Sequence, residues 1–380
     1  MKYINYKQII FLVAIVISTK VQGQHLFEFD GQASLYGSYS PKNDLNLFIG
    51  GRYLPELNYG YTFKNKSMLD FEASANLYGS VLFSAFDSSK TDGNIKPYRV
   101  WARYTGNQFE VRLGLQKINF GTATILRPLQ WFDQMDPRDP LQFTTGVYGA
   151  LGRYYFLNNA NIWAWVLYGN ENSRGFELMK SNKNSPEFGG RVQLPVPKGE
   201  VGFTYHHRNA SSKKLAGFPS YDNIAENRYA LDGKWDIEVG VWFEAVHINK
   251  AKDVGILTNQ TFLTTGVDYT FAIGSGLNIT LENMLTSYNS NAFGFKNNSN
   301  FTATSIMYPL GFFDKISTML NYSWKSKDLS FFLNYEHQFK KLTGYVMAFY
   351  NPDTVPGVGT VSYENSFSGA GFRLMLVYNH

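Results

Sequence analysis

Alternation of apolar and polar residues runs through many short segments of this chain and limits its fold more than any other feature. In the segment 109–116, Phe, Val, Leu and Leu alternate with Glu, Arg, Gly and Gln. A period of two is typical of a β-strand whose two faces meet different surroundings. The same alternation recurs at 69–77, 98–105, 238–245, 277–282 and 372–379. The chain is therefore predicted to be all-β.

The connections between the predicted strands alternate in length. We predict strands at 31–40, 54–64, 67–85, 96–105, 108–118, 147–156, 160–169, 186–195, 200–210, 225–235, 238–248, 261–273, 276–289, 301–309, 314–324, 328–339, 342–350 and 369–380. Short turns follow the even-numbered strands, and long polar segments follow most of the odd-numbered ones. Outer-membrane barrels combine short periplasmic turns with long outer loops. The pattern predicts a transmembrane antiparallel β-barrel of about 16–18 strands, with about 18 as the best count.

A secreted β-sandwich or β-propeller is the soluble alternative. In a sandwich the apolar face of each strand points to a core, whereas in a membrane barrel it points to lipid and the polar face lines the lumen. The regular alternation of connection length favours the barrel. Composition agrees, because charged residues make up 17% of the chain, below the roughly 25% of an ordinary soluble domain.

The N-terminal segment has the features of a secretory signal peptide. Two lysines precede an apolar run at 9–17, and the triplet 21–23 offers small residues for cleavage. The run is shorter than a bilayer-spanning anchor, which is the alternative interpretation. We expect residues 1–23 to be removed on export and residues 24–380 to form a single barrel domain in a bacterial outer membrane.

The composition also argues against several classes of function. The chain contains no Cys, so neither disulfide nor thiolate chemistry is expected. A formal net charge of +5 without a clustered basic helix indicates no nucleic-acid partner. His206 and His207 are adjacent on one predicted strand and point to opposite faces, so they are not expected to share a metal. We expect no enzyme, no cofactor and no metal site.

One long connection, residues 118–146, is predicted to be the third outer loop. It contains prolines, aromatic residues and charges of both signs, namely Arg127, Asp133, Asp136, Arg138 and Asp139. Loops of this length are usually functional or disordered, and the aromatic residues and prolines favour an ordered one. We predict that it folds into the lumen and narrows a pore. The alternative is an outer lid or a wall-packing element with no role in selectivity.

Charged residues on the polar faces of the predicted strands would line the lumen. Arg99, Arg103 and Arg112 lie on adjacent predicted strands and are expected to form a basic ladder opposite the loop, with Glu110 beside them. A water-filled lumen tolerates such charges, whereas each would cost roughly 2–4 kcal/mol on the lipid face near mid-membrane. Rings of charge set the ion preference of a pore. The alternative is that the arginines pair with Glu110 and Glu72 and only pack the wall.

The stretch 113–140 resembles a pattern found in porin-like outer-membrane barrels of Gram-negative bacteria, with a composition like that of members from Bacteroidetes-type bacteria. In that pattern a strand with Gly-x-Gln runs into an aromatic residue and Gly, followed by a loop with Pro and Asp. The matching residues are Gly114, Gln116, Phe120, Gly121, Pro128, Asp136, Pro137 and Pro140. The resemblance implies a channel for passive diffusion of small hydrophilic or charged solutes.

The last segment, 371–380, is typical of a final barrel strand that the outer-membrane assembly machinery reads, although it ends in His380 and not in an aromatic residue. The expected partners are outer-membrane lipid, that machinery and small solutes, and a homo-oligomer is compatible with the sequence. The alternative function is a non-conducting barrel that acts as a binding or assembly component of an uptake or secretion complex.

Overall fold

The computed structural model describes residues 25–41, 45–84, 89–213, 215–352, 367 and 369–380. The signal-peptide prediction lies outside these residues. Within them the chain is almost entirely β, with one 3-10 helix, η1 (Gly255–Leu257). None of the described helical structure has the length and apolar character needed to cross a membrane.

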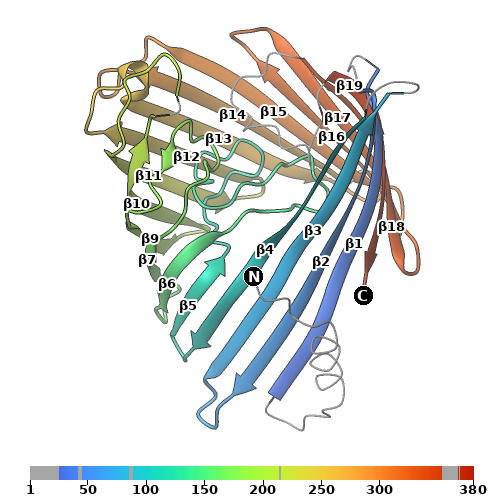
Figure 1. The fold of residues 1–380 in the computed structure, drawn as a ribbon, viewed down its shortest axis with the longest axis horizontal. Coiled ribbons are helices and arrows are strands. Elements are labelled where there is room, and N and C mark those ends of the chain that lie inside the picture. Colours follow the sequence, from blue (N-terminus) through green and yellow to red (C-terminus); the bar gives the residue numbers. More distant parts are fainter. Residues whose placement is uncertain (1–24, 42–44, 85–88, 214, 353–366, 368) are drawn as a thin grey trace.

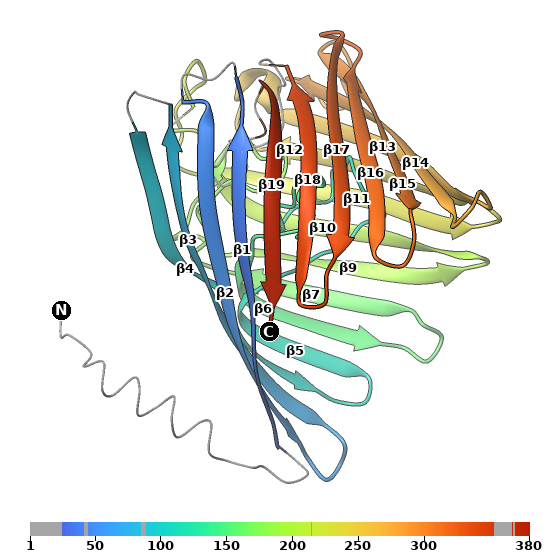
Figure 2. The ribbon, with the colours of Figure 1, turned by 90° about the vertical axis from the view of Figure 1, so that its right-hand side faces the viewer.

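The strands form one closed antiparallel barrel (Figures 1 and 2). They are β1 (His25–Tyr39), β2 (Leu47–Thr62), β3 (Met68–Phe83), β4 (Ser89–Thr105), β5 (Phe109–Gln116), β6 (Val147–Tyr155), β7 (Asn161–Leu167), β8 (Lys180–Ser181), β9 (Glu187–Val196), β10 (Gly199–Ser211), β11 (Ile224–Asp236), β12 (Gly240–Lys250), β13 (Asn259–Phe271), β14 (Leu277–Asn289), β15 (Asn298–Pro309), β16 (Asp314–Ser323), β17 (Asp328–Gln338), β18 (Leu342–Asn351) and β19 (Gly369–Asn379). In the described part of the chain, β8 pairs only with the end of β10, and the other 18 strands make the wall. Pairing of β1 with β19 closes it, which confirms the predicted barrel and its best strand count.

Short turns join the strands at the end of the barrel where β1 begins and β19 ends (Figure 2). Several of these turns place a residue in the left-handed region, as at Lys66 (φ 67°), Asn159 (φ 66°), Lys198 (φ 59°) and Gly274 (φ 57°). Tight hairpin turns require positive φ because their twist must match that of the strands. The long connections, including 118–146 and 168–186, lie at the opposite end.

Three strands begin six or seven residues earlier than predicted. β1 begins at residue 25, β2 at 47 and β4 at 89, where the prediction had 31, 54 and 96. The first residues of β2 and β4 were predicted to lie in loops, but there Gly51 pairs with Gly79 and Gly79 pairs with Gly93 across three strands. Ladder hydrogen bonds to both neighbours therefore outweigh the weak strand propensity of glycine.

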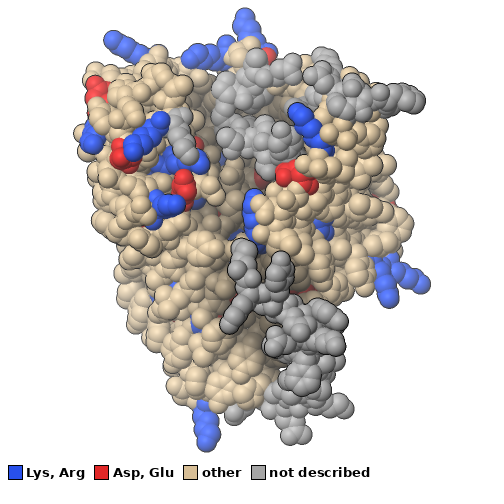
Figure 3. Space-filling view, in the orientation of Figure 1, with Lys and Arg blue, Asp and Glu red and all other residues tan. Residues whose placement is uncertain are grey.

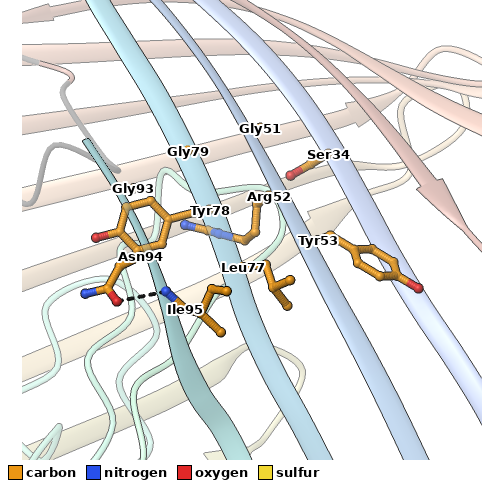
Figure 4. A pocket seen from close by; sticks show the side chains of 10 residues that line it. All are labelled: Ser34, Gly51, Arg52, Tyr53, Leu77, Tyr78, Gly79, Gly93, Asn94 and Ile95. Carbon is orange, nitrogen blue, oxygen red and sulfur yellow. Dashed lines mark hydrogen bonds between the residues drawn. The ribbon is translucent and has the colours of Figure 1, made fainter. Parts of the chain in front are cut away.

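The paired glycines leave a hollow in the wall over β1–β4, with a volume of about 580 Å³ (Figure 4). They share the face of the barrel that carries Leu35, whose side chain is 59% exposed. The lining residues are Ser34, Gly51, Arg52, Tyr53, Leu77, Tyr78, Gly79, Gly93, Asn94 and Ile95. The hollow thus thins the wall.

The two faces of the wall differ as a membrane barrel requires. On β10, for example, Phe203 is 52% exposed, whereas its neighbour Thr204 and the next inward residue, His206, are fully buried. Figure 3 shows the visible outer wall as mostly uncharged, with charged side chains gathered towards its upper end and in the central hollow. Apolar side chains therefore cover the face that a transmembrane barrel presents to lipid.

Placing a charge on that face tests the assignment. Leu231, in the middle of β11, is 48% exposed, and both of its chain neighbours are buried. We expect Leu231→Arg to lower the free energy of unfolding in lipid vesicles by about 2–4 kcal/mol, because the guanidinium would enter hydrocarbon. Denaturant titration measures this, with Leu231→Phe as the apolar control. A change within about 0.5 kcal/mol, as at a water-exposed site, would contradict the lipid-facing assignment.

Candidate functional site

Residues 118–146, here called loop A, join β5 to β6 but make many of their contacts with β12, β13 and β14. Five strands of the wall separate β5 from β12 in the described barrel. Figure 1 shows the segment as a teal coil between β4 and β5 on one side and β11–β14 on the other. Its partners are inward side chains of those distant strands, so its position is set from across the barrel.

Glu244 of β12 is the first of two carboxylates that hold loop A. Its Oε1 accepts hydrogen bonds from the backbone N–H groups of Thr122, at 2.6 Å, and Ala123, at 2.8 Å. Its Oε2 accepts one from the N–H of Leu129, at 3.1 Å. All three donors belong to loop A, and the side chain is fully buried. A buried carboxylate is costly unless such donors surround it.

Glu282 of β14 is the second carboxylate. It accepts hydrogen bonds from the N–H groups of Thr124, Ile125 and Leu126, at 2.6, 3.0 and 2.6 Å, and from the hydroxyl of Thr124. On β13, between the two glutamate strands, the hydroxyl of Thr264 donates to the carbonyl of Leu126 at 3.0 Å. We call this set of contacts the two-glutamate clamp.

Two glycines make room for the clamp. The indole Nε1 of Trp242 reaches across β13 to donate to Glu282 at 3.1 Å, and a Cβ on Gly266 would lie 2.2 Å from that indole. Gly121 has φ of 100°, and a Cβ there would lie 2.4 Å from Oε1 of Glu244. A side chain at Gly121 would therefore be strained and would push the loop away from its carboxylate.

Behind the clamp, loop A has an apolar core shared with the wall. Leu129, Trp131 and Phe132 of the loop are between 0% and 3% exposed. They pack with inward residues of β6, β7, β11, β12, β13 and β14, such as Trp165 and Phe262. Burial of these large side chains stabilises the docked loop through the hydrophobic effect.

Loop A also contacts the opposite part of the wall. Ile125 and Leu141 pack against a second apolar cluster, which consists of Phe367 and of residues on β1, β2 and β16–β19 such as Phe48, Phe332 and Met347. The loop thus touches inward residues on two sides of the barrel.

The charged residues that were predicted in loop A interact mainly with partners inside the loop. Arg138 pairs with Asp136 at 2.7 Å and also reaches Asn351 of β18 at 3.2 Å. The carboxylate of Asp139 accepts hydrogen bonds from the N–H groups of Leu141 and Phe143 and closes a turn.

Arg127 and Asp133 form a weaker pair in the same loop. Their closest charged atoms are 3.6 Å apart, and Arg127 donates instead to Asn119 at 2.6 Å. Asp133 is 1% exposed, and among the described residues neither of its carboxylate oxygens has a hydrogen-bond donor. Burial raises the pKa of Asp133 above its usual value of 3.8, and attraction to Arg127 and Lys117 offsets only part of this.

The structure brings Arg103, Glu110 and Arg112 together on the inward face of β4 and β5. Arg103 pairs with Asp70 of β3 at 2.8 Å and lies 4.0 Å from Glu110. Arg112 and Arg153 lie 3.6 and 3.3 Å from the other oxygen of Glu110. Three arginines therefore share two carboxylates, so much of the predicted basic ladder is neutralised.

In the alternative interpretation the arginines pair with Glu110 and Glu72, but the carboxylate of β3 that pairs with Arg103 is that of Asp70. Asp70 stands directly opposite Arg103 in the β3–β4 register, whereas Glu72 stands opposite Trp101. Register is fixed by the hairpin turn and cannot be read from alternation, which places both carboxylates on one face.

Arg99 is separate from the other two arginines of the predicted ladder. A register shift at Ser74 leaves Tyr98 as an extra residue in β4, so Tyr98 and Arg99 both contact loop A. Arg99 donates to the hydroxyl of Thr144 at 2.6 Å, and the ring of Tyr98 stacks on Phe143 with centroids 4.8 Å apart. Such a bulge re-aims side chains, here towards the end of loop A.

A second connection, residues 168–186, is here called loop B and packs against loop A. A Cβ on Gly175 would lie 2.2 Å from the carbonyl oxygen of Gln130, and the guanidinium of Arg174 lies over the ring of Phe132. Loop B, Arg153 and Asp70 were not among the predicted site residues. Alternation in 147–156 places Arg153 inward with Leu151, which was an available signal.

In the described ranges, no group of three His, Asp or Glu side chains is arranged to hold a metal ion. The side chains of the lumen and of loop A can make hydrogen bonds, ion pairs and apolar contacts with a solute. Charged side chains, above all Glu244 and Glu282, fix the position of loop A.

The raised pKa of Asp133 predicts a pH dependence of loop A. Because the pKa of Asp133 is higher in the folded than in the unfolded protein, its protonated form favours the folded state. This contribution to the stability of loop A is fully present below pH 3.8 and is lost as the pH rises through the folded-state pKa. We expect Asp133→Asn to slow hydrogen exchange of loop A at pH 7 roughly fivefold, about 1 kcal/mol, and to flatten the pH dependence above pH 4. Asp136→Asn is the control, since it removes the ion pair with Arg138 and should speed exchange. Faster exchange in Asp133→Asn than in the parent would contradict the prediction.

No protein-family model matches the chain, and no curated protein matches its sequence. Solved structures match it over nearly its whole length at low identity. OccAB4 of Acinetobacter baumannii is 10% identical with a TM-score of 0.55, covering 94% of this chain and 98% of that one. OccK5 (OpdH) of Pseudomonas aeruginosa is 12% identical with a TM-score of 0.55, covering 93% and 97%.

A third match is Wzi of Escherichia coli, an outer-membrane protein involved in group 1 capsule assembly and described as a carbohydrate-binding β-barrel. It is 10% identical with a TM-score of 0.52, covering 99% of this chain and 89% of that one. At these identities the likeness concerns the fold alone. The chain therefore has the closed barrel fold of porin-like outer-membrane proteins, as the resemblance of its sequence implied.

Proposed function

We propose that this chain is an outer-membrane, porin-like channel for passive diffusion of small hydrophilic or charged solutes, with loop A as its constriction. The observation that carries the proposal is the two-glutamate clamp. It ties the backbone of loop A to inward carboxylates on the far side of the barrel from β5. A segment held at a fixed place across a wide barrel defines an opening of constant size, which size-selective diffusion requires.

Charged side chains on the inward face support a wetted path. The side chains of Arg103, Arg112 and Arg153 are 27%, 14% and 17% exposed. Lys315 and Glu336, which pair on β16 and β17, are 38% and 24% exposed. Charges that remain accessible inside a barrel are compatible with water in the lumen and with a field across it.

Within this proposal the candidate residues take different roles. Arg103, Glu110 and Arg112 line the path with compensated charge. Arg99 holds the end of loop A, and the loop residues Arg127, Asp133, Asp136, Arg138 and Asp139 shape the constriction through contacts within the loop. Selectivity would then depend on how the loop is shaped more than on a free basic ladder.

The same proposal includes the setting of the barrel. Residues 24–380 would form one domain in the outer membrane after removal of the signal peptide, with β19 read by the assembly machinery. Outer-membrane lipid would cover the apolar face. The Asn-rich and Tyr-rich composition supports a Bacteroidetes-type member.

A second candidate function is a non-conducting barrel that binds or assembles part of an uptake or secretion complex. The observation that favours it is the apolar core of loop A, whose Phe132 is fully buried against the wall. A water-filled pore has no need of such a core in its lumen. Wzi, with its carbohydrate-binding description, has a comparable fold.

Removing the clamp should distinguish the two functions in planar bilayers. In Glu244→Ala/Glu282→Ala, loop A loses seven hydrogen bonds to carboxylates, each contributing about 1.5–3 kcal/mol. We expect the parent to give discrete conductance steps and the double variant to give larger, noisier ones, because the loop is released. Glu171→Ala, which removes an exposed loop carboxylate, is the control and should behave as the parent.

Each result of this experiment favours or excludes one of the two functions. Steps only in the double variant would replace the channel by the plugged barrel, since loop A would then close the lumen. Absence of steps in both proteins would exclude a pore gated by loop A. Identical steps in both would show that loop A is not the constriction.

A further inference from the structure

The carboxylate of Glu177 in loop B lies among buried guanidinium groups. Nη1 of Arg208 is 3.0 Å from its Oε2, and Nη2 of Arg228 is 2.7 Å from its Oε1. Arg174 of the same loop adds a guanidinium at 3.8 Å and a backbone N–H at 3.0 Å. The side chain of Glu177 is 3% exposed, and those of Arg208 and Arg228 are 1% exposed. Glu177 is thus bound as an anionic ligand would be.

The wall side of this site carries an excess of positive charge. Arg208 and Arg228 of β10 and β11 each lie 2.6 Å from Oε1 of Glu226, and Lys250 of β12 lies 3.3 Å from its Oε2. Three cations against one carboxylate leave a formal charge of +2 on the wall. Glu177 reduces it to +1.

The neighbouring carboxylate Glu187 does not supply the missing charge to these three cations. It pairs with Arg174 at 2.8 Å and with Nε2 of His206 at 3.2 Å. Nδ1 of His206 accepts a hydrogen bond from the indole of Trp165, so the proton of a neutral ring lies on Nε2 and is donated to Glu187. Both ring nitrogens of His206 are therefore hydrogen-bonded to side chains of the wall, and its neutral ring adds no cation to the site.

Glu177 fills the space between the cations. The cavity that remains beside it, lined by Arg208, Glu226, Arg228 and Lys250 among others, measures about 10 Å³, roughly the room of one water molecule. A ligand of the size of a carboxylate or phosphate enters only when Glu177 leaves. Since β8 fixes loop B beside β10 at Ala210 and Ser211, Glu177 is the part of the loop that must move.

We infer that Arg208, Arg228 and Lys250 form a binding site for the phosphate group of a solute or surface ligand, and that Glu177 occupies this site as an internal competitor. Paired arginine side chains bind phosphate oxygens bidentately, and a dianion neutralises the wall more fully than the single charge of Glu177. Binding of such a group displaces Glu177 and loosens loop B from the wall. The inference stands whether or not the barrel conducts.

Vacating the site and adding inorganic phosphate tests this directly on purified protein in detergent micelles. Thermal unfolding is followed by tryptophan fluorescence in sodium phosphate and in sodium chloride of equal ionic strength. In Glu177→Ala we expect about 50 mM phosphate to raise the unfolding midpoint by roughly 2–4 °C over chloride. In the parent the difference should stay below about 1 °C, because Glu177 competes from within the same chain at high effective concentration.

Two double variants locate the effect. Glu177→Ala/Arg228→Gln should lose the phosphate response, whereas Glu177→Ala/Lys315→Gln, which removes a lysine elsewhere in the barrel, should keep it. Should Glu177→Ala fail to fold, Glu177→Gln preserves the volume of the side chain and should respond to phosphate more than the parent. A response no larger than that of the parent in both Glu177 variants, or an equal response without Arg228, would overturn the inference.

Discussion

Two buried carboxylates, Glu244 and Glu282, impose the constraint on which the interior of this barrel depends. In the part of the chain that the structure describes, the hydrogen-bond donors to Glu244 are all backbone N–H groups of loop A, and the wall gives Glu282 only the indole of Trp242. A buried carboxylate without donors costs several kcal/mol. The wall is therefore incomplete without the loop, and the loop in turn has six backbone donors that find their acceptors on these two side chains. The wall supplies acceptors for the backbone of the loop, and the loop supplies donors for the buried carboxylates of the wall.

Loop B is held to the wall in a similar way, but here the wall supplies the cations and the loop supplies the carboxylate. The wall at β10–β12 carries more cations than carboxylates, and the loop supplies Glu177. Both loops begin at the same end of the barrel and pack against each other at Gly175. The inward face from β6 to β14 is thus covered by chain that is held by charge-assisted hydrogen bonds and filled in with apolar side chains. Because the loops are in contact, movement of one is expected to change the packing of the other.

The fold could be predicted from sequence because alternation and connection length are local. These signals failed at the starts of β1, β2 and β4. In β2 and β4, glycines such as Gly51 and Gly93 obtain their strand conformation by pairing with Gly79 of β3. The contacts of the candidate site were harder to predict than the fold. Alternation placed Arg103, Glu110 and Arg112 on one inward face, but the choice of Asp70 over Glu72 depends on register. The clamp joins residues more than 100 positions apart and has no local signal.

The Phe-Gly pair that carried the sequence resemblance has a physical reason in this chain. Gly121 stands where the backbone turns to positive φ, and its missing side chain lets Oε1 of Glu244 approach the next two N–H groups. Phe120 stacks on Trp165 with centroids 5.6 Å apart, so the residue before the turn is anchored to the wall. An aromatic anchor followed by a residue without Cβ is therefore what a loop needs to leave a strand, cross an interior and meet a carboxylate. The motif that seemed to mark a loop instead marks the start of its attachment to Glu244.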